Sequence, residues 1–219
     1  MTVASVLFDL DGTLTDPFPG ITKSIQYAMD RLGRTVPDQA DLRFCIGPPL
    51  QESFAQLLES DDASEIDQAV TFYRERFSST GIYENVLYDD VPECLERLKK
   101  AGLKLFVATS KPKVFADRIV RYFAIDHYFT GIYGAELDGR FSDKSQLIAH
   151  LMAEEELRAA NTVMIGDRKH DLIGAHANNI RAVGVSYGYG TQDELAGEKP
   201  VTVVSSPKEI ILLFKNNII

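Results

Sequence analysis

Two aspartates, Asp9 and Asp11, follow directly after a short apolar run in VLFDLDGT (residues 6–13). Two unit charges 4 Å apart repel by about 4 kcal/mol at an effective dielectric constant of 20, so carboxylates crowded at the end of a buried strand need a compensating charge. A carboxylate can form a phosphoryl-aspartate intermediate, and a neighbouring one can protonate a leaving oxygen and later deprotonate water. This chemistry would make Asp9 a nucleophile and Asp11 a general acid and base.

Two further carboxylates, Asp167 and Asp171, lie in IGDRKHD (165–171), at the end of another apolar run. A hard divalent cation would offset the repulsion among these groups, and oxygen ligands suit Mg²⁺ in particular. Asp9, Asp167 and Asp171 are therefore candidate metal ligands. Asp167 and Asp171 are four residues apart and share a face if a helix begins there.

Hydroxyl, amide and ammonium groups in the sequence fit a phosphate. Thr109 and Ser110 follow an apolar run and can donate to phosphate oxygens, as can the backbone N–H groups of Gly12 and Thr13. Lys144 would neutralise the charge that the metal ion leaves uncovered. These groups therefore predict a phosphate site.

The elements that must position these side chains follow an alternating pattern. Compact apolar runs, bounded by polar residues or glycine, predict buried strands, and the stretches between them have helical patterns. The predicted strands are 3–8, 103–109, 161–166, 181–186 and 201–204, with a weaker one at 129–134; the predicted helices are 91–102, 113–123, 144–157 and 171–179. The alternation predicts an α/β fold with a parallel sheet covered on both faces. The carboxyl ends of such strands line the ligand crevice.

The region from about residue 16 to residue 83 departs from this alternation. It contains helical stretches such as 21–33 and 66–77 and no convincing strand. We expect a helical insertion directly after the first strand.

The overall composition restricts the partners. The 219 residues carry a formal net charge of −9, which argues against a nucleic acid polymer as the main partner. We expect no signal peptide and no membrane span, because no suitable apolar segment is present. Cys45 and Cys94 form no CxxC or zinc-type spacing, which favours a cytoplasmic location. No feature of the sequence indicates an oligomeric state.

Four segments resemble, in order, the motifs of the haloacid dehalogenase-like (HAD) superfamily: DLDGT (9–13), VATSK (107–111), Lys144 and GDRKHD (166–171). The resemblance covers nearly the whole chain and implies a Mg²⁺-dependent phosphohydrolase acting on a small phosphate ester.

The same resemblance implies a domain division and the role of each residue. Residues 1–15 and 84–219 would form a Rossmann-like, doubly wound hydrolase core, and residues 16–83 a small helical cap. Asp9 would be the nucleophile and Asp11 the acid and base, while Thr109 and Lys144 would hold the transferring phosphate. The implied metal ligands are the Asp9 side chain, the Asp11 backbone carbonyl and the Asp167 side chain, supported by Asp171 directly or through water.

Within the superfamily, the chain is most similar to the phosphoglycolate phosphatase-like group. Ser110 departs from the Asn that phosphoglycolate phosphatases often have at this position. Arg43 and Gly47 are candidates for substrate specificity in the cap, although a structural helix–turn–helix explains the Gly-Pro-Pro sequence at 47–49 equally well. Lys111 and Lys23 are candidates for steering an anion, with solvated lysines as the default interpretation. The segments that resemble the bacterial branch labelled 5′-nucleotidase are IGPPL (46–50), ATSKP (108–112), IGDRKHD (165–171) and GYG (188–190).

Two other functions stay open at this stage. A sugar phosphomutase with the same core would pass the phosphoryl group from Asp9 to a sugar hydroxyl. A phospho-aspartate signalling switch would combine similar residues on a parallel sheet. Such switches are usually about half this length and lack a helical insertion, so the block at 16–83 argues against that function.

Overall fold

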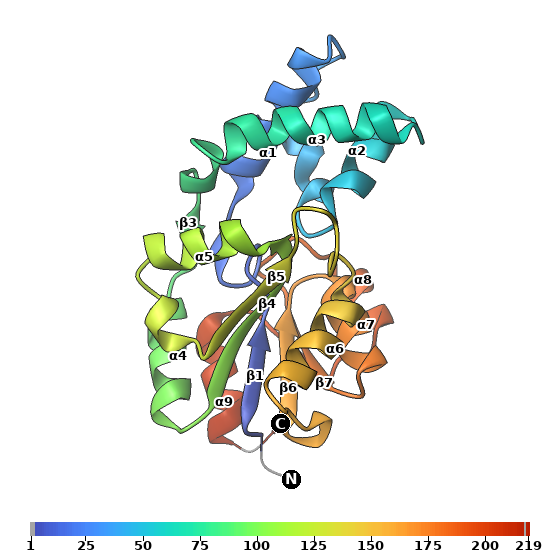
Figure 1. The fold of residues 1–219 in the computed structure, drawn as a ribbon. Helices are drawn as coiled ribbons and strands as arrows, with labels where there is room; N and C mark the ends of the chain where they lie inside the picture. The colour runs from blue at the N-terminus through green and yellow to red at the C-terminus, as the bar shows by residue number, and fades with distance from the viewer. Residues whose placement is uncertain (1–2, 217) are drawn as a thin grey trace. The chain divides into compact units, whose positions relative to one another are not determined.

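The computed structural model describes residues 3–216 and 218–219, and its main feature is a six-stranded sheet (Figure 1). The strand order is β5-β4-β1-β6-β7-β8, and each neighbouring pair is parallel. The strands are β1 (Ser5–Phe8), β4 (Lys104–Pro112), β5 (Gly131–Ala135), β6 (Thr162–Gly166), β7 (Arg181–Val185) and β8 (Thr202–Val204), and two-residue strands lie at β2 (Thr15–Asp16) and β3 (Val86–Leu87). The predicted parallel α/β sheet is confirmed.

Helices cover both faces of this sheet, as the alternating pattern predicts (Figure 1). On one face α4 packs against α9, and on the other α6 packs against α7. The helices are α1 (Phe18–Arg31), α2 (Leu50–Leu58), α3 (Ala63–Phe77), α4 (Val91–Lys100), α5 (Lys113–Tyr122), α6 (Lys144–Glu154), α7 (Lys169–Ala177), α8 (Gln192–Gly197) and α9 (Pro207–Lys215). Helices α8 and α9 are absent from the sequence prediction. The apolar run IILLF at 210–214 hides the helical period of α9.

The central strand β1 is buried on both faces. Leu7 belongs to an apolar cluster that includes Ile148 of α6 and Leu172 of α7. Phe8 points the other way, toward a small apolar space that it shares with Leu95 of α4 and with α9. Full burial of one such side chain contributes about 1.5–3 kcal/mol, so β1 is anchored from both sides. The residue after this anchored strand is Asp9.

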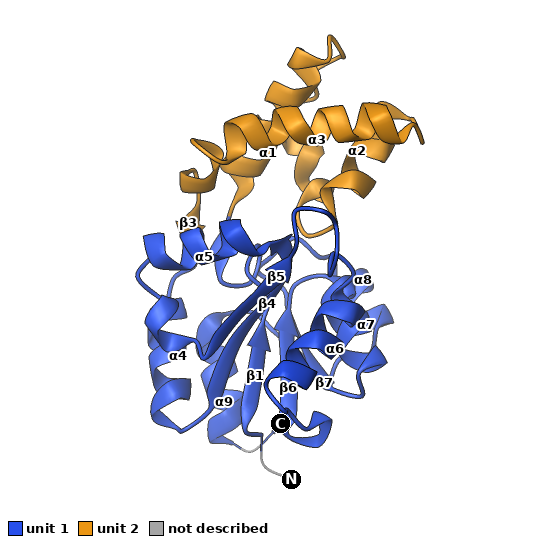
Figure 2. Ribbon diagram, viewed as in Figure 1, with its two compact units in different colours: residues 1–16, 87–219 blue, residues 17–86 orange. Residues whose placement is uncertain are grey.

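The chain divides into two compact units, drawn in different colours in Figure 2. One contains residues 1–16 and 87–219, and the other contains residues 17–86. The second unit is built from helices: α1 and α2 both pack against α3. Its aromatic core includes Tyr73, which stacks on Phe77 at a centroid distance of 5.2 Å. The assignment of these units as a hydrolase core and a cap stays a prediction.

Within residues 3–216 and 218–219, no helix combines the length and the apolar character that a membrane span needs. The cytoplasmic location stays a prediction.

Candidate active site

Asp9 stands at the carboxyl end of β1, directly beside β6. Its backbone N–H donates to the carbonyl oxygen of Ile165 at 3.0 Å, which extends the pairing of β1 with β6 by one bond. Only 4% of Asp9 is exposed. A carboxylate this deeply buried depends on protein groups or a cation for charge compensation.

Lys144 provides part of that compensation. Its Nζ lies 2.9 Å from Asp9 Oδ1 and 2.8 Å from Asp171 Oδ1, and it donates to the Ala108 carbonyl oxygen at 2.9 Å. An ammonium group has three donors, so these three acceptors use all of them. Lys144 is the first residue of α6, where Asp143 caps the helix by accepting from the Gln146 N–H at 2.9 Å.

Asp167 follows directly after β6 and is fully buried. The Thr13 hydroxyl donates to its Oδ1 at 3.3 Å, and the Tyr189 backbone N–H donates to its Oδ2 at 2.8 Å. Both bonds stabilise the ionised carboxylate and fix its orientation.

Asp171 belongs to a helix, whereas Asp167 does not. Helix α7 begins at Lys169, so the condition for a shared helix face is not met, and Asp167 lies in the loop before the helix. Asp171 accepts from the Arg168 N–H at 3.1 Å, which satisfies a donor at the helix N-terminus. The two carboxylates therefore approach each other from a loop and a helix.

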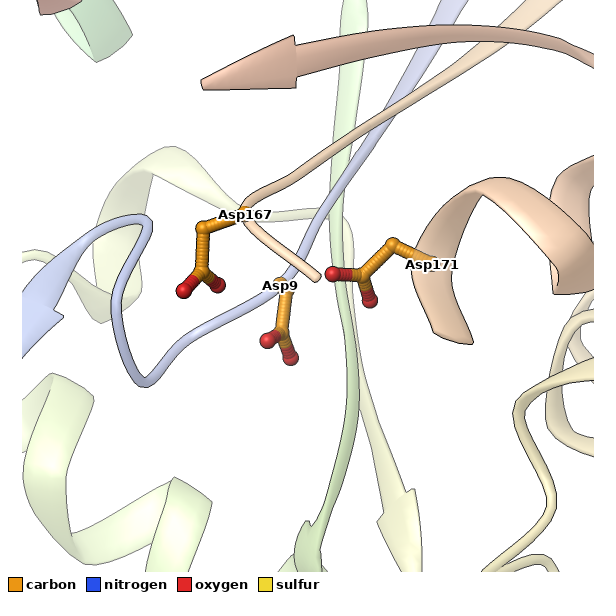
Figure 3. A group of neighbouring side chains, drawn as sticks. All are labelled: Asp9, Asp167 and Asp171. Carbon is orange, nitrogen blue, oxygen red and sulfur yellow. The ribbon is translucent and has the colours of Figure 1, made fainter. Parts of the chain in front are cut away.

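Figure 3 shows the side chains of Asp9, which follows β1, Asp167, in the loop after β6, and Asp171, in α7; the three lie close together. Each offers a carboxylate oxygen, and these oxygens all lie within 4.8 Å of one another. The structure therefore groups the three side chains that the sequence predicts as metal ligands. Their role as ligands stays a prediction.

Asp11 is paired with Lys111. The Lys111 Nζ lies 2.6 Å from Asp11 Oδ2, and the two side chains are only 6% and 9% exposed. The interpretation of Lys111 as a solvated lysine is therefore wrong. The other oxygen of Asp11, Oδ1, is buried and has no hydrogen-bond partner among the described residues.

Burial raises the pKa of several of these carboxyl groups. Burial raises the pKa of Asp167 well above its ordinary value, and the charges of Asp171 and Asp9 raise it further. For Asp171, burial and the charge of Asp9 outweigh the attraction of Lys144, and the pKa rises to about 6. Burial also raises the pKa of Asp11, although Lys111 opposes the shift. The protein groups alone thus compensate these negative charges incompletely.

The same surroundings favour the charged form of Lys144. Burial alone would lower the pKa of its ammonium group, but the charges of Asp171 and Asp9 outweigh that effect and raise it. Lys144 therefore remains positively charged throughout the neutral range.

The donor set fits a magnesium ion. Four buried carboxylates, those of residues 9, 11, 167 and 171, face two buried ammonium groups, those of residues 111 and 144. Two negative charges remain uncompensated when all six groups are ionised. Mg²⁺ prefers oxygen ligands, and a divalent charge would balance the cluster. Asp9 and Asp167 would hold the ion, with Asp171 beside them.

Gly12 makes room for this cluster. Its φ of +87° is disfavoured for residues with a side chain, and a Cβ here would lie 2.3 Å from Asp167 Oδ2. Its N–H donates to the Thr15 carbonyl oxygen at 2.7 Å, and the Thr13 N–H donates to the Leu10 carbonyl oxygen at 3.3 Å. Both amides thus have acceptors within the loop, and the predicted contact of Gly12 with phosphate stays a prediction.

Thr109 and Ser110 lie in the last part of β4, the strand that pairs with β1. Thr109 is 2% exposed, and its hydroxyl oxygen accepts from the Lys111 N–H at 3.3 Å. Ser110 is partly exposed. Their predicted role in phosphate binding stays a prediction.

Arg43 and Gly47 belong to the unit of residues 17–86. Arg43 is an exposed residue of the 3₁₀ helix Gln39–Cys45, with its guanidinium 5.8 Å from the Phe18 ring centroid. Gly47 follows that helix. Their role in specificity stays a prediction.

Tyr187 and Tyr189 are site residues that the sequence reasoning misses. The Tyr187 hydroxyl donates to the Thr13 carbonyl oxygen at 3.0 Å, and Tyr189 donates to Asp167 through its N–H and to Asp16 through its hydroxyl. The available signal is the segment YGYG at 187–190, after β7, because glycines on both sides of Tyr189 allow a close approach of backbone.

Comparison with known proteins places these observations in a family. Residues 6–185 match the family model described as haloacid dehalogenase-like hydrolase. The solved structure of a predicted phosphatase from Clostridium acetobutylicum superimposes with a TM-score of 0.95 at 38% identity, covering 99% of this chain and 100% of that one.

Curated relatives carry several different names. A 5′-nucleotidase of Pseudomonas aeruginosa is 53% identical over 196 residues, which cover 90% of this chain and 88% of the relative. The tyrosine-protein kinase PtkA of Mycobacterium tuberculosis is 39% identical over 188 residues, covering 86% of this chain and 64% of the relative. A phosphoglycolate phosphatase of Colwellia psychrerythraea is 29% identical over 217 residues, covering 96% of each chain.

Proposed function

This chain belongs to the haloacid dehalogenase-like hydrolase family, and we propose that it hydrolyses small phosphate monoesters through a phosphoryl group carried on Asp9. The resemblance expected from the four motifs is confirmed by the family match. Phosphatase relatives support the coarser statement that it is a hydrolase of phosphate monoesters. What we propose beyond this is the phospho-aspartate step, the use of a metal ion and a small phosphate monoester as the substrate.

The observation that carries the proposal is the position of Lys144 between Asp9 and Asp171. A buried lysine 2.9 Å from a buried carboxylate places positive charge where an anionic phosphate would approach that carboxylate. Asp9 can then attack phosphorus, while Lys144 stabilises the charge on the equatorial oxygens of the phosphoryl group. The raised pKa of Lys144 supports this role, because the ammonium group keeps its charge.

We assign proton transfer to Asp11. In the first step an oxygen of Asp9 forms a bond to phosphorus, the ester bond breaks, and the leaving oxygen takes the proton of Asp11. In the second step Asp11 takes a proton from water, whose oxygen attacks phosphorus and releases inorganic phosphate from Asp9. The raised pKa of Asp11 supports its use as an acid, because a larger fraction is protonated near neutral pH.

Magnesium is the cation that we propose for the cluster of Asp9, Asp167 and Asp171. When bound, it would supply positive charge to the phosphate oxygens and to the carboxylates. The backbone carbonyl of Asp11 is the further ligand that the family resemblance implies.

We further propose that the unit of residues 17–86 is the cap and that residues 1–16 and 87–219 form the hydrolase core. A cap excludes water from the reacting groups and selects substrates. Arg43 and Gly47 are the candidates for selection, and Thr109, Ser110 and Gly12 for phosphate contacts.

The first experiment is a screen for phosphate release with Mg²⁺ present. Nucleoside monophosphates come first, because the relative with 53% identity is named 5′-nucleotidase, and phosphoglycolate and sugar phosphates follow. We expect turnover by the native chain and its loss in Asp9→Asn. Asp117→Asn, which removes a carboxylate on α5 that pairs with Lys113, is the matched control. Near-normal turnover in Asp9→Asn would overturn the assignment of the nucleophile.

Analysis of the products separates hydrolysis from transfer to another acceptor. A phosphomutase would yield an isomer with little free phosphate. The relative named tyrosine-protein kinase makes a tyrosine hydroxyl a second acceptor to test, with nucleoside triphosphate as donor. A signalling switch would give one slow phosphorylation without steady release of phosphate.

A further inference from the structure

Tyr189 contacts both the acidic cluster and the residue at which the chain leaves its first unit. Its backbone N–H donates to Asp167 Oδ2 at 2.8 Å, and its phenolic hydroxyl donates to Asp16 Oδ1. Asp16 lies in β2 and is the last residue before the unit of residues 17–86 begins. Tyr189 thus joins Asp167, a candidate metal ligand, to Asp16, the last residue before the 17–86 unit.

The backbone around Tyr189 lies directly against Asp167. A Cβ on Gly188 would lie 2.4 Å from the Asp167 Cβ, and a Cβ on Gly190 would lie 2.0 Å from the Asp167 carbonyl oxygen. The Tyr187 hydroxyl also donates to the Thr13 carbonyl oxygen at 3.0 Å. This short segment can therefore shift only together with its neighbours.

We propose that Tyr189 is a positioning residue for the metal site, which acts through Asp167. Its bond to Asp16 holds the phenol, the phenol holds the backbone, and the N–H fixes one oxygen of Asp167 so that the other can face the ion. This proposal rests on the proposed function, because it takes Asp167 as a magnesium ligand. Groups that orient a metal ligand commonly change metal affinity when they are altered.

The bond between Tyr189 and Asp16 also couples Mg²⁺ binding at Asp167 to the attachment of Asp16 to Tyr189. Binding free energies are reciprocal, so a contact that favours metal binding is in turn favoured by the bound metal. Magnesium at Asp167 therefore strengthens the attachment of Asp16 to Tyr189. Any movement at the beginning of the 17–86 unit that breaks this attachment weakens magnesium binding.

Magnesium binding to the full chain, measured by titration calorimetry, tests the proposal without any substrate. Tyr189→Phe removes the phenolic donor and keeps the N–H, and Asp16→Ala removes its acceptor. We expect each to weaken Mg²⁺ binding about 3- to 10-fold, which is less than the 10- to 100-fold typical of direct ligand partners. The double variant should bind Mg²⁺ no more weakly than the weaker of the two single variants, because both substitutions remove the same bond.

Two further variants distinguish positioning from a general structural effect. Asp16→Asn keeps an oxygen acceptor and should bind Mg²⁺ like the native chain. Tyr133→Phe removes a tyrosine hydroxyl that bonds Glu155 at 2.7 Å, and should also leave Mg²⁺ binding unchanged. At saturating Mg²⁺, kcat and KM of Tyr189→Phe should return to within about twofold of the native values, since the defect lies in metal affinity.

The outcomes separate this inference from the proposed function. Native Mg²⁺ affinity in Tyr189→Phe would overturn the positioning role even if phosphate esters are hydrolysed. Additive losses in the double variant would overturn it as well. Weakened Mg²⁺ binding in both single variants, restored in Asp16→Asn, would support it even if the screen of esters finds no substrate.

Discussion

The ammonium group of Lys111 lies 2.6 Å from the carboxylate of Asp11, and both side chains are almost completely buried. Removal of one partner of such a pair leaves an uncompensated buried charge, whereas removal of both charges does not. The stability of the chain should therefore depend on the pair as a unit.

Lys111→Met should lower the free energy of unfolding by about 3 kcal/mol in the absence of metal, because Asp11 would lose the cation that opposes its burial. Adding Asp11→Asn to this variant should restore much of the loss, since no buried charge then lacks its partner. Urea denaturation of the two single variants and the double variant measures the coupling. Strictly additive losses would show that the two charges act independently.

Gly12→Ala should disrupt the acidic cluster. The new methyl group would stand 2.3 Å from Asp167 Oδ2 at a φ of +87°, so either the loop or the carboxylate must move. We expect phosphatase activity to fall by at least about 100-fold, as for a misplaced reacting group. The measurement is kcat/KM for the best substrate of the screen.

Gly102→Ala is the matched control for that variant. Gly102 has a similar φ of +85°, but nothing lies within 4 Å of the position of its Cβ. The two variants share the backbone strain of about 1–2 kcal/mol and differ in the contact with Asp167. Equal activity in the two would rule out the crowding of Asp167 as the cause of any loss.

The sheet and the convergence of most site residues are predictable from local patterns. Apolar runs such as 161–166 are compact and bounded, and the carboxyl ends of parallel strands meet at one edge of a sheet. Asp9 and Asp167 each follow such a run directly, so their proximity follows from the fold class alone. Lys144, 135 positions from Asp9, joins them because its helix begins at the same edge.

The partners of Asp11 and Asp167 are harder to predict, because they depend on the paths of loops. The apolar run near residue 105 predicts a strand that ends at Thr109, but β4 continues to Pro112. This extension carries Lys111 into the buried site, although the polar residues around it in the sequence favour a solvated position. Tyr189 reaches Asp167 only because glycines on both sides of it allow backbone contact, and the tyrosine by itself carries no such signal.

Acid should weaken the unit of residues 17–86 through Glu84. The Arg76 guanidinium, bonded at 2.8 Å, lowers the pKa of this carboxyl group; burial opposes the shift, and Lys23 at 3.0 Å adds to it. A carboxyl group with a lowered pKa in the folded state contributes stability above its unfolded pKa and loses it as the pH falls through the folded value. Glu84→Gln should therefore destabilise this unit by about 1 kcal/mol at pH 7 and progressively less toward pH 3.

Hydrogen exchange of α1 and α3 amides at several pH values measures this difference for the native chain and the variant. Glu96→Gln, which removes an exposed carboxylate that pairs with Lys100 on α4, is the control. Glu96→Gln should leave the hydrogen exchange of the α1 and α3 amides unchanged at every pH. A constant effect of Glu84→Gln from pH 7 to pH 3 would contradict the role of its ionisation.

Magnesium affinity should fall in acid because protons compete for the same carboxylates. Burial raises the pKa of Asp167 well above its ordinary value and that of Asp171 to about 6. Metal ligands must be deprotonated, so binding releases protons wherever the free groups are partly protonated. Titration calorimetry at pH 5.5 should therefore show about threefold to tenfold weaker binding than at pH 8, together with proton release that depends on the buffer.

Asp171→Asn is the variant that tests the origin of this dependence. It removes the group whose pKa lies near 6, so it should reduce both the pH dependence and the number of protons released. Asp167→Asn removes a proposed ligand and should abolish measurable binding at either pH. Equal Mg²⁺ affinity of the native chain at pH 5.5 and pH 8 would mean that the ion does not bind at these buried carboxylates, and the metal site would then have to lie elsewhere in the chain.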